Sequence, residues 1–382
     1  MPNKRVFYAC QAVVITAPSD PDNPGLQVAF DGAVKGVQSV GITTNFNLEQ
    51  VFELGQIQIF ENIEGVPDVE VTLEKIFAGE TTGLTGSAVT LFEMCTAGAA
   101  GLSLVNRSKQ RCRVSLGVYD DADDAVAGNA PTEIVMDGLY VSSLSYNIPV
   151  DGQVTESITL VGNSKVFSNA ATNVTGNKLN VDPFGDDGPT TPSANAGGVQ
   201  RRENVQIESC AFPSTVAGTV GTGQGNGWDS VNLIPRVHLQ NITISTDFSR
   251  EDILELGRKA PYYRAPNFPI EVTCDIETIA TSTDGVIAFE EGKDSSGGAN
   301  DNSTTFNNLY GAGVAGTIND GDNSPEEEIY IFLDDQTSFD LKDKNRLSSV
   351  TYGGGDASGG NTTITYSYTN FNELEVDGGV GI

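Results

Sequence analysis

The sequence predicts an all-β protein with short flanking helices, built from two tandem copies of one domain. Glycine is frequent, with 43 residues in a chain of 382, and turn residues separate short alternating segments. This pattern is typical of many strands joined by loops. A segment of the first half also recurs in the second half at a nearly constant spacing. The chain is long enough for each copy to bury a core of its own.

The clearest repeat pairs TTNFNLEQVFELG in the first half with STDFSREDILELG in the second. Both segments predict a short helix, at Leu48–Leu54 and Arg250–Leu256, that ends at a glycine suited to a left-handed conformation. These glycines, Gly55 and Gly257, are 202 residues apart (257 − 55), as are all matching residues of the two segments. The predicted N-cap residues and their partners are Asn47 with Gln50 and Ser249 with Asp252.

A strand is expected after each predicted helix. VEVTLE begins at Val69 and IEVTCD at Ile270, now 201 residues apart (270 − 69). Apolar and polar residues alternate strictly in both, which predicts a half-buried strand with one wet face. The acidic residues on that face are Glu70, Glu74, Glu271 and Asp275.

A closing hairpin completes each copy. VSSLSY begins at Val141 and LSSVTY at Leu347, and a glycine-containing turn and a further strand follow each. The order of elements therefore predicts a whole-domain duplication. We expect copy one at residues 1–167, a linker or arm at 168–202, and copy two at 203–382.

The charge and the cysteines limit the classes of function. Asp and Glu number 51 against 21 Lys and Arg, a net charge of −30. Such a surface lacks the basic clusters that neutralise phosphates, and it should repel DNA and anionic membranes. Five cysteines without a CxxC pair predict neither a disulfide framework nor a zinc site. The apolar run near the start predicts a strand rather than a signal peptide.

Groups suited to catalysis or ligand binding are scarce. His238 is the only histidine in the chain, which leaves no two-histidine metal site and no catalytic triad in duplicate. The glycine-rich stretch Gly221–Gly227 lacks the Lys-Ser/Thr of a P-loop, and the acidic run Asp120–Asp124 lacks the spacing of an EF-hand. We therefore expect no catalytic residue, no cofactor and no bound metal, and a protein that is not an enzyme.

The residues GVQSVGITTNFNLEQVFELG and ENIEGVPDVEVTLEK resemble the tail tube (major tail) proteins of long-tailed bacteriophages. The second copy keeps the helix and strand motifs but has IPRVHLQNITIST in place of the hairpin opening. The motifs cover about a quarter of the chain. The resemblance implies a β-sandwich or barrel in each copy, and a virion protein whose rings stack into a tube that conducts genomic DNA.

Several expectations follow from this resemblance. Two domains per chain imply a ring of three chains with pseudo-sixfold symmetry, made in the host cytoplasm and placed in the phage tail. Partners would be copies of the chain, other tail proteins and DNA passing without specific binding, and no membrane. The acidic strand face would line the channel, unless it forms the outer wall. The alternatives are another ring-forming tail, baseplate or injection-machine component, or an acidic β-rich surface adhesin.

The long segments Ala78–Gln110 and Glu290–Glu327 stand at matching places in the two copies. Long loops in compact domains are common contact sites. The first of them is also too apolar to lie free in water. We expect both to make contacts between stacked rings or neighbouring subunits. In the alternative, the apolar part of the first segment folds back onto its own domain.

Overall fold

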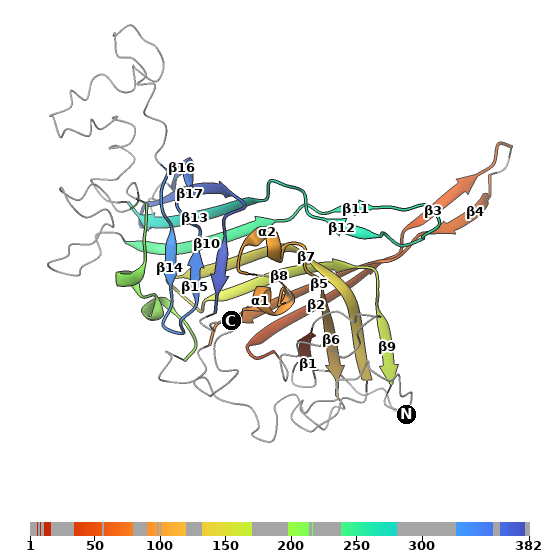
Figure 1. Cartoon of the computed structure of the whole chain (residues 1–382), viewed down its shortest axis with the longest axis horizontal. Helices are drawn as coiled ribbons and strands as arrows, with labels where there is room; N and C mark the ends of the chain where they lie inside the picture. The colour runs from red at the N-terminus through yellow and green to blue at the C-terminus, as the bar shows by residue number, and fades with distance from the viewer. Residues whose placement is uncertain are drawn as a thin grey trace, which may run out of the picture.

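The computed structural model of the chain describes residues 11–16, 34–78 without 56, 90–119 without 98 and 100, 132–169, 198–213, 238–280, 326–353 and 360–378, and residues 6, 8 and 216. A long antiparallel sheet dominates the molecule (Figure 1), and its main path runs β16-β17-β13-β10-β7-β8-β5-β2. The bounds of these strands are β2 Val37–Asn45, β5 Asp68–Ile76, β7 Thr132–Pro149, β8 Thr155–Gly162, β10 Leu239–Asp247, β13 Glu271–Ile279, β16 Arg346–Gly353 and β17 Thr363–Phe371. The predicted all-β class is confirmed.

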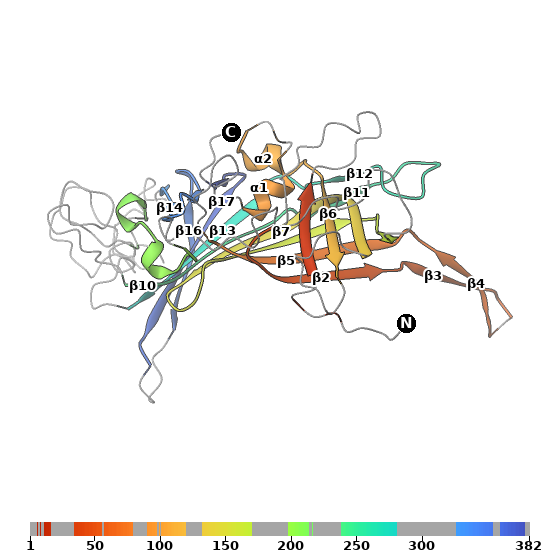
Figure 2. The ribbon, with the colours of Figure 1, turned by 90° about the horizontal axis from the view of Figure 1, so that it is seen from below.

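Smaller elements cover one face of this sheet (Figure 2). The first part of the long strand β7 leaves the main path near Gly138, whose φ is +68°, and pairs with β6 and β9. A separate sheet of β14, β15 and β18 lies over the second half. The bounds are β1 Gln11–Thr16, β6 Cys112–Val118, β9 Val166–Asn169, β14 Tyr330–Phe332, β15 Ser338–Asp340, β18 Glu375–Asp377, α1 Leu91–Cys95 and α2 Leu104–Arg107.

Buried and exposed side chains alternate along the strands, and the buried ones form a core between the main sheet and the smaller elements that cover it. In β5, Val69, Val71 and Leu73 are buried, whereas Glu70 and Glu74 point to the open face. The β13 strand alternates in the same way. The predicted strands after the repeated segments are therefore confirmed, including their acidic faces.

The two halves of the main sheet repeat one strand order and one register. Each half runs from its first strand through two inner strands to its last: β2-β5-β8-β7, then β10-β13-β17-β16. The irregularities also recur, next to Val37 and Leu239 in the first strands and next to Val141 and Leu347 in the last. The boundaries predicted at residues 167 and 203 stay a prediction, and most of the predicted linker lies outside the described residues.

The register corrects one detail of the sequence repeat. Val69 lies opposite Thr44 in the first half, and Thr246, the counterpart of Thr44, lies opposite Val272. Val69 therefore corresponds to Val272 and not to Ile270. A shift of two residues along a strand leaves every side chain on the same face, so the alternating sequence could not detect it.

The two predicted helices are wrong, because both segments form the first strand of a projecting hairpin. The first arm, residues 46–65, contains β3 (Leu48–Phe52) and β4 (Ile59–Glu64), and the second arm, residues 248–267, contains β11 (Glu251–Ile253) and β12 (Tyr263–Ala265). Gly55 and Gly257 do have positive φ, but between the strands of a hairpin. A helix of two turns needs a surface to pack on, whereas the arm satisfies its backbone with a partner strand and extends beyond the body (Figure 1).

The caps predicted for these helices are wrong as well. The Asn47 side chain donates to the Val66 carbonyl and to Asp68, at 3.0 and 2.9 Å. Ser249 has a φ of +40°, and its N–H donates to Asp247. Both residues thus fix the bend from the main sheet into an arm.

The described apolar residues of the segment Ala78–Gln110 fold back onto the body of the molecule. Leu91, Phe92 and Leu104 of α1 and α2 are fully buried against the sheet, which is the folded-back alternative. Side chains of this size are more stable inside the core than on a wet surface. The segment Glu290–Glu327, except its last two residues, lies outside the described residues, as do Asp120–Asp124 and Gly221–Gly227.

Candidate assembly interface

The two halves of the main sheet meet at a strand pair, β7 with β10. The last strand of the first half lies antiparallel to the first strand of the second, with Tyr146 opposite Ile244 and Leu144 opposite Thr246. All four side chains are buried. On the open face, the Thr243 hydroxyl donates to the Asn147 side chain across the same joint, at 3.3 Å. The chain thus contains a complete strand-to-strand contact between two similar halves of one sheet.

Phe248, at the base of the second arm, adds contacts across this joint. The Phe248 N–H donates to the Ser142 carbonyl of β7, at 2.9 Å. The Phe248 ring has no exposed surface and stacks on Phe92 of α1, with centroids 6.3 Å apart. A residue of the second half therefore completes the core of the first half.

Arg250 makes charged hydrogen bonds across the joint. Its Nε donates to the Val141 carbonyl at 2.5 Å, and Nη2 donates to the Ser108 carbonyl at 2.6 Å. The guanidinium lies 4.9 Å from the centroid of the Tyr140 ring. Burial lowers the pKa of Arg250 to about 10, so the side chain stays cationic at neutral pH. Hydrogen bonds from a charged donor to carbonyls are stronger than neutral ones.

Arg264, on β12, adds a second arginine to the joint. It pairs with Asp68 at the start of β5 at 2.5 Å and with Asp252 of its own arm at 3.2 Å. Burial alone would raise the pKa of Asp68, but hydrogen bonds from Asn47, Arg264 and Asn163 lower it. Beside this pair, the rings of Tyr263 and Tyr140 meet edge to face, with centroids 5.7 Å apart.

The outer strands β2 and β16 repeat β10 and β7, but no further strand pairs with their outer edges among the described residues. Tyr352 of β16 corresponds to Tyr146 of β7, yet the first is 51% exposed and the second is fully buried. Phe46 next to β2 corresponds to Phe248, and it is 66% exposed against 0%. Side chains that are buried at the internal joint therefore have exposed counterparts at the outer strands.

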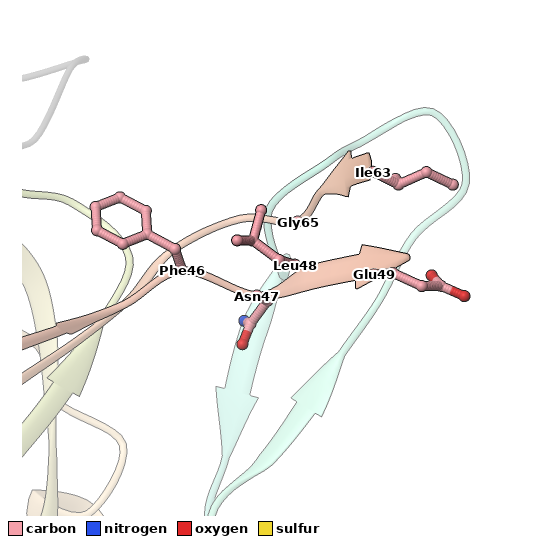
Figure 3. A pocket seen from close by; sticks show the side chains of 6 residues that line it. All are labelled: Phe46, Asn47, Leu48, Glu49, Ile63 and Gly65. Carbon is pink, nitrogen blue, oxygen red and sulfur yellow. The ribbon is translucent and has the colours of Figure 1, made fainter. Parts of the chain in front are cut away.

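The first arm is the most exposed apolar surface of the described chain. A hollow of about 440 Å³ at its root is lined by residues that include Phe46, Leu48 and Ile63 (Figure 3). Exposed apolar patches rimmed by polar residues mark contact sites for proteins, membranes or ligands. The large apolar side chains exposed on this arm are Phe46, Leu48, Phe52, Leu54, Ile57, Ile59, Phe60 and Ile63.

The structure brings together few groups suited to chemistry. His238 is exposed, and its carbonyl accepts a hydrogen bond from the Ile279 N–H. Within the described ranges, no three His, Cys, Asp or Glu side chains gather as a metal site. None of the described helices is long and apolar enough to cross a membrane.

No family model matches the sequence, and no curated protein matches it. Matches to solved structures comprise 21 chains. The tube-terminating cap of the anti-feeding prophage (AFP) is 14% identical with a TM-score of 0.29, over 44% of this chain and 95% of that one. The PVC sheath/tube terminator of an extracellular contractile injection system is 14% identical with a TM-score of 0.29, over 44% and 99%. A chain of the AFP baseplate is 10% identical with a TM-score of 0.30, over 44% and 99%.

Proposed function

We propose that the chain is a structural subunit of a bacteriophage tail tube, in which β16 of one chain pairs with β2 of the next. The internal pair of β7 with β10 carries this proposal. β16 repeats β7 and β2 repeats β10 in strand order and register. Uncovered strand edges favour association, and pairing them removes the unsatisfied backbone groups.

The internal joint also gives the register of the proposed pair. Ser145 lies opposite Ser245 within the chain. The counterpart of Ser145 is Thr351, and the counterpart of Ser245 is Thr43. Thr351 of one chain should therefore lie opposite Thr43 of the next, and Tyr352 opposite Ile42.

This contact joins two different edges, so repeating it does not make a twofold dimer; it makes a closed ring when the rotation from chain to chain closes the circle. If each half of the chain occupies one-sixth of a turn, three chains close the circle. The ring is then threefold, with approximate sixfold symmetry, because half of its joints lie within a chain and half between chains.

The open face of the main sheet would line the bore of such a ring. Glu70 and Glu74 of β5 and Glu271 and Asp275 of β13 lie on this face, opposite the helices. A negative wall repels phosphates, so DNA would pass without the salt-dependent binding that a basic wall produces. The role is mechanical and requires no catalytic group.

The mass of a single ring tests the proposal. Purified protein, examined by native mass spectrometry and by averaged electron micrographs, is expected to form rings of three chains with a central hole. A ring of six full-length chains would contradict the assignment of one-sixth of a turn to each half. Protein that stays monomeric at high concentration would contradict ring formation itself.

A further inference from the structure

We infer that the first arm packs against the β16 edge of a second copy of this chain, a contact that we call the clasp. Apolar side chains and one ion pair would make the clasp, whereas arginines make the corresponding contact at the internal joint. This inference rests on the proposed function, because it takes the β2–β16 contact as its frame. The repeat indicates this partner for the first arm. The second arm already packs against β7 within the chain, and the first arm has the same strand register as the second.

The apolar part of the clasp consists of Phe46 and Leu48. Phe46 corresponds to Phe248, whose N–H binds a β7 carbonyl and whose ring is buried. Leu48 corresponds to Arg250, the residue that reaches across the internal joint. Both first-arm residues are more than 60% exposed, at 66% and 61%. Closing the ring would bury them and stabilise it by the hydrophobic effect.

The polar part of the clasp is a predicted pair of Glu61 with Arg346. At the internal joint, Tyr263 of the second arm packs on Tyr140 of β7. The counterparts are Glu61 on β4 and Arg346 on β16, so an aromatic pair is replaced by opposite charges. Within the chain, Arg346 pairs with Glu326 at 2.9 Å, and both side chains are 51% exposed. An exposed pair of this kind is weak and can exchange its partner.

The other arginine of the internal joint has no charged counterpart in the clasp. Arg264 corresponds to Asn62 on β4, and its partner Asp68 at the start of β5 corresponds to Glu271. The joint within the chain is therefore rich in charge–carbonyl and charge–carboxylate contacts, and the joint between chains is mainly apolar.

Two sets of variants test the clasp, both in a Thr43→Cys/Thr351→Cys background that reports β2–β16 pairing by a disulfide. Leu48→Asp is expected to raise the protein concentration for half-maximal cross-linking roughly tenfold or more, since it places an unpaired carboxylate in the interface. Leu54→Asp is the matched control. Leu54 is fully exposed next to Gly55 between the two strands of the arm, and its replacement should leave cross-linking unchanged.

The charge pair is tested separately, which keeps the inference falsifiable if Leu48→Asp does not fold. Glu61→Arg and Arg346→Glu should each raise that concentration about twofold to fivefold, and the double variant should restore it. Unchanged cross-linking in Leu48→Asp, or no recovery in the double variant, would overturn the clasp while leaving the β2–β16 contact intact. Absence of cross-linking in the parent cysteine variant would instead overturn the proposed function.

Discussion

Replacing Phe339 with alanine is expected to lower the free energy of unfolding by about 3–5 kcal/mol, the usual cost of removing a buried phenylalanine. Phe339 lies on β15 of the second half, and its ring has no exposed surface. Its centroid is 4.7 Å from that of Tyr146 and 6.0 Å from that of Phe77, both in the first half. The cavity would therefore open between the halves.

Chemical denaturation combined with hydrogen exchange measures this effect. Because the halves share one sheet and this aromatic cluster, Phe339→Ala should weaken amide protection in β5 and β8 as well as in β13 and β17. Tyr262→Ala, at a side chain that is 65% exposed, is the control and should change the stability by less than about 0.5 kcal/mol. Loss of protection in the second half alone would show that the halves fold independently.

The second large effect is expected at Glu156, a fully buried carboxyl group on β8. It accepts hydrogen bonds from the Leu91 and Phe92 N–H groups of α1, at 2.6 and 3.0 Å, and from the Tyr146 hydroxyl at 3.1 Å. Glu156→Ala leaves two buried N–H donors without their acceptor, so we expect a loss of about 2–5 kcal/mol. Glu156→Gln keeps a carbonyl acceptor in place of one of the two carboxylate oxygens, so it should lose less than Glu156→Ala.

Glu156 also makes the stability of the natural protein depend on pH. Burial raises the pKa of Glu156, although Lys75 and the three hydrogen bonds oppose this effect. A folded pKa above the unfolded value means that the folded state binds the proton more tightly. The resulting stabilisation is complete below the unfolded pKa and is lost as the pH rises through the folded pKa.

Unfolding curves between about pH 4 and pH 7 test the direction of this change in stability, since the unfolded pKa of Glu is about 4.3. The stability of Glu156→Gln relative to the natural protein should improve as the pH rises, because glutamine cannot ionise. Thr72→Ala, on the exposed face of β5, removes no ionisable group and is the control, so its relative stability should not change with pH. A relative stability of Glu156→Gln that declines with pH would contradict the assignment.

The strands of the fold could be predicted because alternation reports directly on a sheet with one buried face. Val69, Val71 and Leu73 show this, since each is buried as its pattern requires. The arms could not be predicted in this way. Leu48–Leu54 has helical spacing and a terminal glycine, but the choice between helix and hairpin depends on the partner strand Ile59–Glu64, whose pairing is not local.

The candidate interface was recognisable only in part from the sequence. Phe46 and Phe248 stand at matching places in the repeat, but the sequence does not show that one ring is buried and the other exposed. The roles of Arg250 and Arg264 depend on carbonyl and carboxylate partners more than a hundred residues away in the chain. The one available signal was the substitution of Arg250 for Leu48 within an otherwise similar segment.

Disulfide formation between Thr43→Cys and Thr351→Cys tests most directly whether the outer edges pair as the internal joint does. Facing side chains of an antiparallel pair have Cβ atoms about 4.5–5.5 Å apart, so small adjustments permit a disulfide. The described natural cysteines, Cys95, Cys112, Cys210 and Cys274, are buried and should not compete. Under mild oxidation, denaturing gels should show covalent dimers and trimers and no larger species. The variant Thr43→Cys/Val350→Cys, with its two thiols on opposite faces, should remain monomeric. Monomers from both variants, or equal cross-linking in both, would contradict the pairing of β16 with β2.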